Sequence, residues 1–164
     1  MNAMVLEKHH DLNRTQAPLV PKTVPIPVPG RHEILIRVAA CGVCHTELDE
    51  IEGRTPPPRL PVIPGHQVVG RVAAGAVDAT RFSIGLRVGV AWINRSCGRC
   101  DHCRAGNENL CAQFAATGRD AHGGYAEFMT VHEAFFALAQ ANQALMELKH
   151  KKIRGAKVLE TGHR

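Results

Sequence analysis

The stretch CGRCDHCRAGNENLC, residues 97 to 111, decides the fold because it places four cysteines within fifteen residues. Their spacing is Cys97-x2-Cys100-x2-Cys103-x7-Cys111. Four thiolates make the closed tetrahedral shell of a structural zinc site, which leaves no open position for chemistry. The x2 spacings let backbone turns aim consecutive sulfurs at one point. The sequence therefore predicts a zinc lobe over residues 94–112 that holds one structural zinc ion.

The alternative is four unrelated or disulfide-bonded cysteines, and the surrounding sequence disfavours it. Residues 1–11 lack the apolar stretch of a signal peptide, and no apolar run approaches the roughly 20 residues that span a bilayer. These features predict a cytoplasmic protein that does not bind a membrane, in which cysteines stay reduced or bind metal. His102 lies inside the lobe, but four thiolates already fill the shell, so it is interpreted as a surface residue.

Composition indicates one domain, residues 1–164, built mainly from short strands. The 17.8 kDa chain is 45% hydrophobic and only 4% aromatic, with 15 glycines and 10 prolines, which suits strands joined by turns. The net charge of +5 does not indicate nucleic-acid binding, because no stacking aromatics interleave with the basic residues near the C-terminus. Those residues are Lys149, Lys151, Lys152, Arg154, Lys157 and Arg164.

Hydrophobic patterning predicts a mainly β chain followed by one late helix. The expected strands are residues 33–40, 67–74, 87–91 and 125–131. The proline-rich segment at 18–30 should run extended over the surface or along a sheet edge, and the proline-rich segment at 54–64 should be a loop. From Glu133 the pattern becomes helical. Leu138, Ala141, Leu145 and Leu148 form one apolar stripe, and Gly155 can end the helix before a short strand at 157–160.

A second set of candidate metal ligands lies at the ends of two predicted strands. The segment CGVCHT, residues 41–46, follows one strand, and GHQ, residues 65–67, precedes another. Cys44 and His66 would supply two of the three protein ligands that a catalytic zinc needs. On residue types alone this signal is weak, because a single cysteine and a single histidine are more often core or surface residues.

Four runs resemble the zinc-dependent alcohol dehydrogenases of the medium-chain dehydrogenase family, in particular their GroES-like catalytic domain. They are CGVCHTELDEIEG, PVIPGHQVVGRV, RVGVAWINRSCGRCDHCRAGNENLC and GGYAEF, in register over roughly residues 30–128. The resemblance implies a distorted GroES-like barrel with a four-cysteine zinc lobe. It also implies a zinc- and NAD(P)-dependent oxidoreductase acting on small alcohols.

By this resemblance Cys44 and His66 stand where catalytic-zinc ligands stand, and Thr46 stands where a hydroxyl relays the alcohol's proton. His45 stands where a side chain approaches the cofactor pyrophosphate, and Trp92 borders the substrate pocket. In the implied scheme, zinc acts as a Lewis acid that lowers the pKa of the alcohol, and hydride passes to the nicotinamide.

Three departures from the family pattern affect this expectation. Gln67 follows the ligand histidine where the family usually has glutamate, and Glu47 stands where aspartate is common, although its longer arm can still orient His66. No G-x-G-x-x-G turn is present, and no cysteine after Cys111 can be the third ligand of the catalytic zinc. Cys41 could replace that ligand, but it is interpreted as a buried thiol.

The run ANQALMELKHKKIRGAKVL, residues 141–159, resembles the extreme C-terminus of the family. We therefore expect residues 133–164 to form a helix and strand joined directly to the domain, with the nucleotide-binding domain excised and no cofactor-binding residues. Without that domain the chain should be nearly inert as a dehydrogenase. A non-catalytic zinc-binding module is the alternative. We also expect a homo-oligomer, formed through the face that the missing domain would leave bare.

Overall fold

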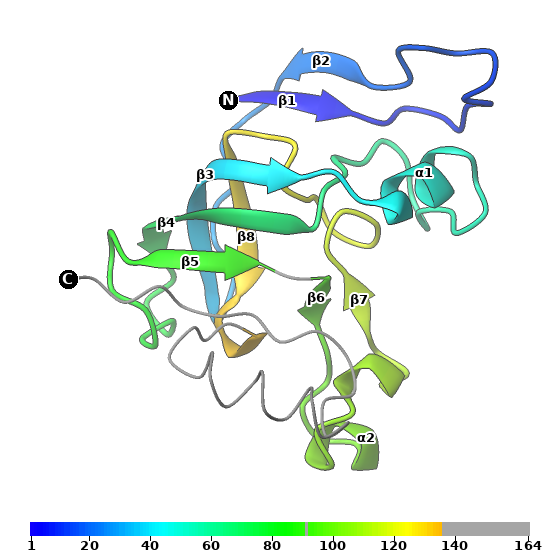
Figure 1. Ribbon diagram of the computed structural model, residues 1–164. Helices are drawn as coiled ribbons and strands as arrows, with labels where there is room; N and C mark the ends of the chain where they lie inside the picture. The colour runs from blue at the N-terminus through cyan, green and yellow to red at the C-terminus, as the bar shows by residue number, and fades with distance from the viewer. Residues whose placement is uncertain (91, 136–164) are drawn as a thin grey trace.

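The computed structural model describes residues 1–90 and 92–135, and its centre is a four-stranded antiparallel sheet (Figure 1). The strands run in the order β5 (Arg87–Val90), β4 (Gln67–Gly75), β3 (Glu33–Gly42) and β8 (Phe128–His132). The fold is mainly β, as the sequence predicts. No helix in the described part of the chain is long and apolar enough to cross a membrane.

The core lies on one face of this sheet. Ile34 and Ile36 are fully buried, and they pack with valines of β4 and β5 and with Met129 of β8. The period-2 alternation predicted for residues 33–40 therefore faces the core as expected. Fully burying a side chain of this size contributes about 1.5–3 kcal/mol. Arg37 on the opposite face stays exposed, and its guanidinium lies 5.4 Å from the centre of the Phe128 ring.

The last strand begins later than its sequence pattern predicts. Tyr125, the predicted first residue, donates its backbone N–H to Pro64 at 3.0 Å, and its carbonyl accepts from Met4 at 2.8 Å. These contacts tie residue 125 to the N-terminal strand and to the proline-rich loop. Pairing with β3 therefore begins only at Phe128, opposite Arg37.

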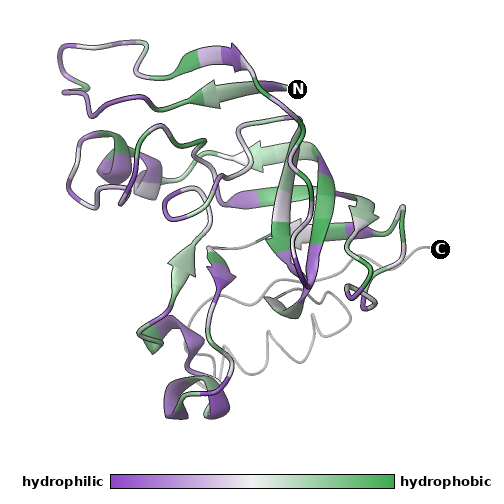
Figure 2. Cartoon of the chain, turned by 180° about the vertical axis from the view of Figure 1, so that it is seen from behind, coloured by the Kyte–Doolittle hydropathy of each residue, from purple (hydrophilic) through white to green (hydrophobic). Residues whose placement is uncertain are grey.

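Two small sheets flank the central one; the sequence predicts an extended edge segment where β2 lies, but not its partner β1 nor the second sheet. β1 (Asn2–Val5) pairs with β2 (Val20–Thr23), which lies inside the predicted extended segment. β6 (Ile93–Arg95) pairs with β7 (Ala115–Ala116) and leads into and out of the cysteine lobe. The lobe itself carries α2 (Asp101–Arg104) and the 3-10 turn η1 (Glu108–Leu110), and its ribbon is largely hydrophilic around α2 (Figure 2).

Helix α1 (His45–Ile51) directly follows β3 and was not predicted. After β8 the structure describes one 3-10 turn, η2 (Glu133–Phe135). The rest of the predicted helix and the strand at 157–160 lie outside the described residues, so the assignment of residues 133–164 stays a prediction. Ala91 at the end of the third predicted strand also lies outside them.

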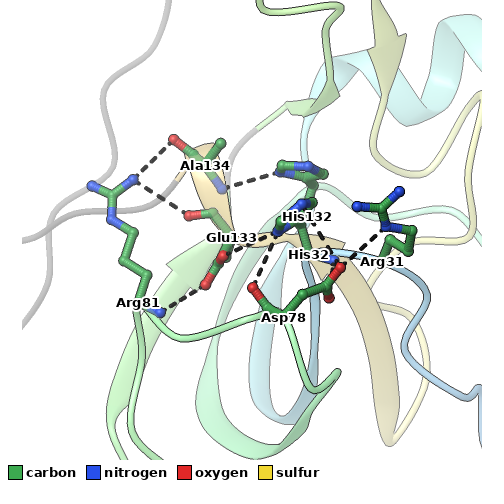
Figure 3. A network of polar contacts seen from close by, with 7 residues as sticks. All are labelled: Arg31, His32, Asp78, Arg81, His132, Glu133 and Ala134. Atoms are coloured by element: carbon green, nitrogen blue, oxygen red, sulfur yellow. Dashed lines mark hydrogen bonds and ion pairs between the residues drawn. The ribbon is translucent and has the colours of Figure 1, made fainter.

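A network of polar contacts ties the end of β8 to the loop between β4 and β5 (Figure 3). Glu133 accepts a hydrogen bond from the backbone N–H of Arg81 at 2.8 Å, and the Arg81 guanidinium donates to the carbonyl of Ala134 at 3.2 Å. Asp78 in the same loop accepts from the backbone N–H of His32 at 2.8 Å. The backbone N–H of Glu133 donates to the carbonyl of His32 at 2.8 Å, so the residue before β3, the β4–β5 loop and the residue after β8 are connected.

Candidate metal centres

The four cysteines of residues 97–111 converge as their spacing predicts. Their sulfur atoms all lie within 4.8 Å of one another. Cys103 Sγ lies 3.8 Å from Cys97 Sγ and 3.5 Å from Cys100 Sγ. A Zn–S bond of about 2.3 Å makes the edge of a tetrahedral four-thiolate site about 3.8 Å. The thiols are thus arranged as a tetrahedral zinc ion requires, and this four-cysteine site could hold a metal.

Backbone N–H groups of the lobe point at the sulfur atoms. The amide of Cys100 lies 3.4 Å from Cys97 Sγ, and that of Gln113 lies 3.3 Å from Cys111 Sγ. The amides of Arg99 and Cys100 lower the pKa of the Cys97 thiol to about 6. Because metals bind the thiolate form, these donors prepare the site for a cation. His102 is exposed, as predicted.

The second set of candidate ligands is organised by Glu47. One carboxylate oxygen of Glu47 accepts the backbone N–H of Cys44 at 2.7 Å and so caps the first turn of α1. The other lies 2.8 Å from Nδ1 of His66. Glu47 is 2% exposed and His66 is 6% exposed, so this contact is buried. One side chain therefore fixes both the cysteine and the histidine, as the sequence analysis considered possible for this longer arm.

The Glu47 contact also sets the protonation of His66. The contact with the Glu47 carboxylate, 2.8 Å from Nδ1, raises the pKa of His66, while burial opposes that change. When Nδ1–H donates to the carboxylate of Glu47, Nε2 keeps its lone pair for a metal. The pKa of the Cys44 thiol is lowered, chiefly by the backbone N–H of Thr46 and then by its hydroxyl, which lies 3.7 Å from Cys44 Sγ. The shift at Cys44 favours the thiolate that binds metal, whereas the raised pKa of His66 favours the imidazolium, which must lose a proton before Nε2 can bind a metal.

The residues around this centre supply no third ligand in the described part of the chain. Across residues 1–90 and 92–135 no third histidine, cysteine or carboxylate atom joins Cys44 and His66 within metal-binding reach. Cys41 is half-buried rather than buried, and burial raises the pKa of its thiol to about 11, which disfavours the thiolate form that binds metal. The side chain of Gln67 is exposed and lies over Gly42, where a Cβ would be 2.7 Å from its amide oxygen.

His45 is exposed, and Thr46 and Trp92 are half-buried. The Trp92 ring lies 5.0 Å from the ring of Phe114, and the guanidinium of Arg119 lies 5.8 Å from the Trp92 ring centre. Trp92 therefore joins the strand pair of the lobe to the segment that follows it. Its predicted place beside a substrate pocket stays a prediction.

Gly65 makes the approach to His66 possible. Its φ of 96° lies in the region that favours glycine, and a Cβ there would lie 2.6 Å from the Tyr125 ring and 2.8 Å from Cys41 Sγ. Any larger residue would push the start of β4 away from these neighbours and would displace the histidine.

Sequence reasoning missed Glu50, a residue of α1 that lies close enough to Glu47 and His66 for their charges to affect its pKa. Glu50 is 1% exposed, and neither carboxylate oxygen has a hydrogen-bond partner among the described residues. Burial raises its pKa to about 7, and the nearby charge of Glu47 adds to the rise. A charged residue in a short helix is expected on the surface, so the sequence carries no signal that would reveal this buried acid.

The model of the family described as "Alcohol dehydrogenase GroES-like domain" matches residues 30–141. "Probable alcohol dehydrogenase AdhA" of Mycobacterium tuberculosis (strain CDC 1551 / Oshkosh) is 51% identical over 123 residues, which cover 72% of this chain and 36% of that protein. An alcohol dehydrogenase of Geobacillus stearothermophilus is 40% identical over 129 residues, which cover 78% of this chain and 36% of its own length.

Solved structures agree with these relatives. An NAD-dependent alcohol dehydrogenase superposes with a TM-score of 0.73 at 32% identity and covers 83% of this chain and 38% of its own. The alcohol dehydrogenase of the archaeon Aeropyrum pernix gives a TM-score of 0.73 at 29% identity, covering 83% and 39%. The chain belongs to the alcohol dehydrogenase family with a GroES-like domain. It spans just over a third of the length of the curated relatives it matches.

Proposed function

We propose that this chain is the zinc-binding part of an oxidoreductase that acts on small alcohols or aldehydes with NAD(P). The observation that carries the proposal is the double contact of Glu47, which holds the Cys44 backbone and the His66 ring at once. A buried carboxylate that orients a histidine beside a cysteine is typical of a metal site's supporting contacts. The proposal includes a cytoplasmic location, where thiols stay available for zinc.

In this proposal the four-cysteine lobe holds a structural zinc, and Cys44 and His66 hold a second one. A zinc at the second site would supply a Lewis acid that polarises the substrate oxygen. The half-buried Thr46 hydroxyl, 3.7 Å from Cys44 Sγ, accepts and passes on the proton of the alcohol. The exposed His45 is placed to approach a cofactor phosphate.

The isolated chain is proposed to be inactive or nearly so. The second site has two ligands and no third donor among the described residues. Activity would require a dinucleotide-binding partner to orient the nicotinamide, and orientation of this kind supplies about 7–11 kcal/mol of a barrier. A non-catalytic zinc module is the second candidate, and the incomplete second site favours it for the isolated chain.

Zinc analysis of the purified chain separates the two candidates. The proposed function predicts one tightly held zinc and a second, partly occupied one that chelators remove easily. Cys44→Ser should abolish only the second zinc, and Cys103→Ser should abolish the first. A single zinc that Cys44→Ser leaves unchanged would argue for the non-catalytic module. Two full, chelator-resistant zincs would contradict the under-coordinated second site.

We also propose that the chain self-associates through the face around the second site. Val43, next to Cys44, is 81% exposed, and Val69, on the strand that begins after His66, is 50% exposed. Soluble monomers rarely keep extended apolar patches in water, and a two-fold dimer is the simplest way to cover one.

Sedimentation across a concentration series tests this proposal. Val43→Ser should weaken the dimer, while Val77→Ser, which changes an even more exposed valine on the β4–β5 loop, should not. A strict monomer at high concentration would contradict the proposed dimer.

A further inference from the structure

Two adjoining cavities lie between the loop at residues 58–62 and the strand pair of the zinc lobe, away from Cys44 and His66. Their volumes are about 590 and 680 Å³. Both fall within the roughly 300–1,000 Å³ of typical small-molecule sites. Arg59, Arg95, Ala115 and Asp120 line both cavities, and we name the combined space the arginine cleft.

The two shared arginines are exposed and have no carboxylate partner. Within residues 1–90 and 92–135 neither the Arg59 nor the Arg95 guanidinium forms an ion pair. Two like charges at one rim raise the local potential and favour an anion between them. The cleft therefore offers two uncompensated guanidinium groups.

The acid shared by the two cavities is already neutralised. Asp120 accepts from Nε and Nη2 of Arg119 at 3.0 and 2.8 Å, and its carboxylate also accepts the backbone N–H of Ala116 at 2.7 Å. Glu33 lines only the smaller cavity. In the larger cavity, Asp120 is the sole acid among the lining residues, so an anion there meets no free carboxylate.

We propose that the arginine cleft binds the phosphate group of a small organic phosphate monoester. A phosphate monoester carries about −1.5 to −2 charges at pH 7, which matches the two free guanidinium groups. Guanidinium pairs bind phosphate oxygens through two parallel N–H donors each. The cavities are larger than inorganic phosphate, and Leu60 and Phe114 in their walls offer apolar surface to an organic body.

Calorimetric titration of the zinc-loaded chain with glycerol 1-phosphate, inorganic phosphate and glycerol tests the proposal without depending on any oxidoreductase activity. Glycerol 1-phosphate should bind most tightly, inorganic phosphate more weakly, and glycerol not at all. Arg59→Gln and Arg95→Gln should each weaken binding about tenfold, the typical effect of one charge-assisted hydrogen bond. Arg14→Gln removes an equal, exposed charge outside the cleft and should leave affinity unchanged.

Amide chemical-shift changes in the wild-type chain provide a readout that does not need any variant to fold. Glycerol 1-phosphate should shift the amides of Ser96 and Ala115, which line the larger cavity, and added sodium chloride should reverse the shifts. The proposal is overturned if no saturable binding occurs, or if the double variant of Arg59 and Arg95 binds as tightly as the wild type.

Discussion

Replacing Glu50 with glutamine is expected to remove a pH-dependent loss of stability. Glu50 is 1% exposed, its two carboxylate oxygens lack partners among the described residues, and its pKa rises from an ordinary 4.5 to about 7. The folded state therefore favours the protonated acid. A carboxyl group with a raised folded pKa contributes its full stability below pH 4.5 and loses it as the pH rises to about 7.

The size of the effect follows from the pKa. A tenfold change in a protonation equilibrium corresponds to about 1.4 kcal/mol, so ionising Glu50 costs the folded state about 3 kcal/mol above pH 7. This is a large share of the roughly 5–15 kcal/mol of an ordinary domain. Glutamine keeps the shape of the neutral acid but cannot ionise, so Glu50→Gln should not suffer this cost.

Urea unfolding of the zinc-loaded wild type and of Glu50→Gln between about pH 5 and pH 8.5 measures the effect. Thiolate and zinc equilibria act on both proteins alike, so they cancel in the difference between the two free energies of unfolding. That difference should grow toward high pH in favour of Glu50→Gln. Glu7→Gln, which removes a carboxylate that is 44% exposed, controls for the loss of one charge. A difference that is constant with pH would refute the reasoning.

Three further changes test other parts of the structure. Cys103→Ser should release the lobe's metal and sharply lower the melting temperature, since closed thiolate sites contribute about 10–16 kcal/mol of binding energy in peptides. Metal analysis measures the first effect and calorimetry the second. An unchanged melting temperature would contradict the four-cysteine site. Glu47→Ala should weaken metal binding at the second site about 10–100-fold in a chelator competition, because the histidine loses its orienting partner; equal competition curves would remove Glu47 from that role. Gly123→Ala should destabilise the fold by more than about 2 kcal/mol, because its Cβ would lie 2.1 Å from the carbonyl oxygen of Gly65. Gly75→Ala, whose Cβ would have its nearest atom at 3.5 Å, should have a mild effect. Similar unfolding midpoints for the two variants would contradict this expectation.

Local signals predicted the central sheet and the lobe well. The alternation over residues 33–40 is a property of one strand, and the convergence of the four cysteines depends on turns within fifteen residues. The loop at 54–64 was also predicted, since its prolines cannot donate to a strand. In each case the information that decides the structure lies close together in the chain.

Elements that depend on distant partners were missed. Helix α1 has seven residues and no apolar period, and its first turn is held by Glu47, whose other contact lies at residue 66. The exposed β2 lies in the segment expected to run extended or along a sheet edge, but its partner β1, on the other side of a long loop, was not predicted. The late start of β8 likewise depends on contacts of Tyr125 with residues 4 and 64. No local pattern carries these pairings.

The candidate second metal site stays a prediction in its ligands, and its arrangement around Glu47 was only partly anticipated. Residue types at the strand ends point only weakly to Cys44 and His66, and the family resemblance strengthens that hypothesis; Glu47 was correctly expected to be able to reach the histidine. The buried Glu50 could not be predicted, because its burial results from the packing around α1 rather than from its own residue type.

The polar network at the end of β8 has a mechanical consequence. Glu133 and Ala134 are fastened to Arg81, and the backbone of Glu133 is fastened to His32 at the entrance of β3 (Figure 3). A force applied at residue 135 is therefore shared between the β4–β5 loop and the residue that precedes β3. It does not act on the hydrogen bonds between β8 and β3 alone. For protein engineering, the end of η2 is therefore a well-anchored position. A domain attached there would be linked to several strands of the sheet rather than to its edge strand alone.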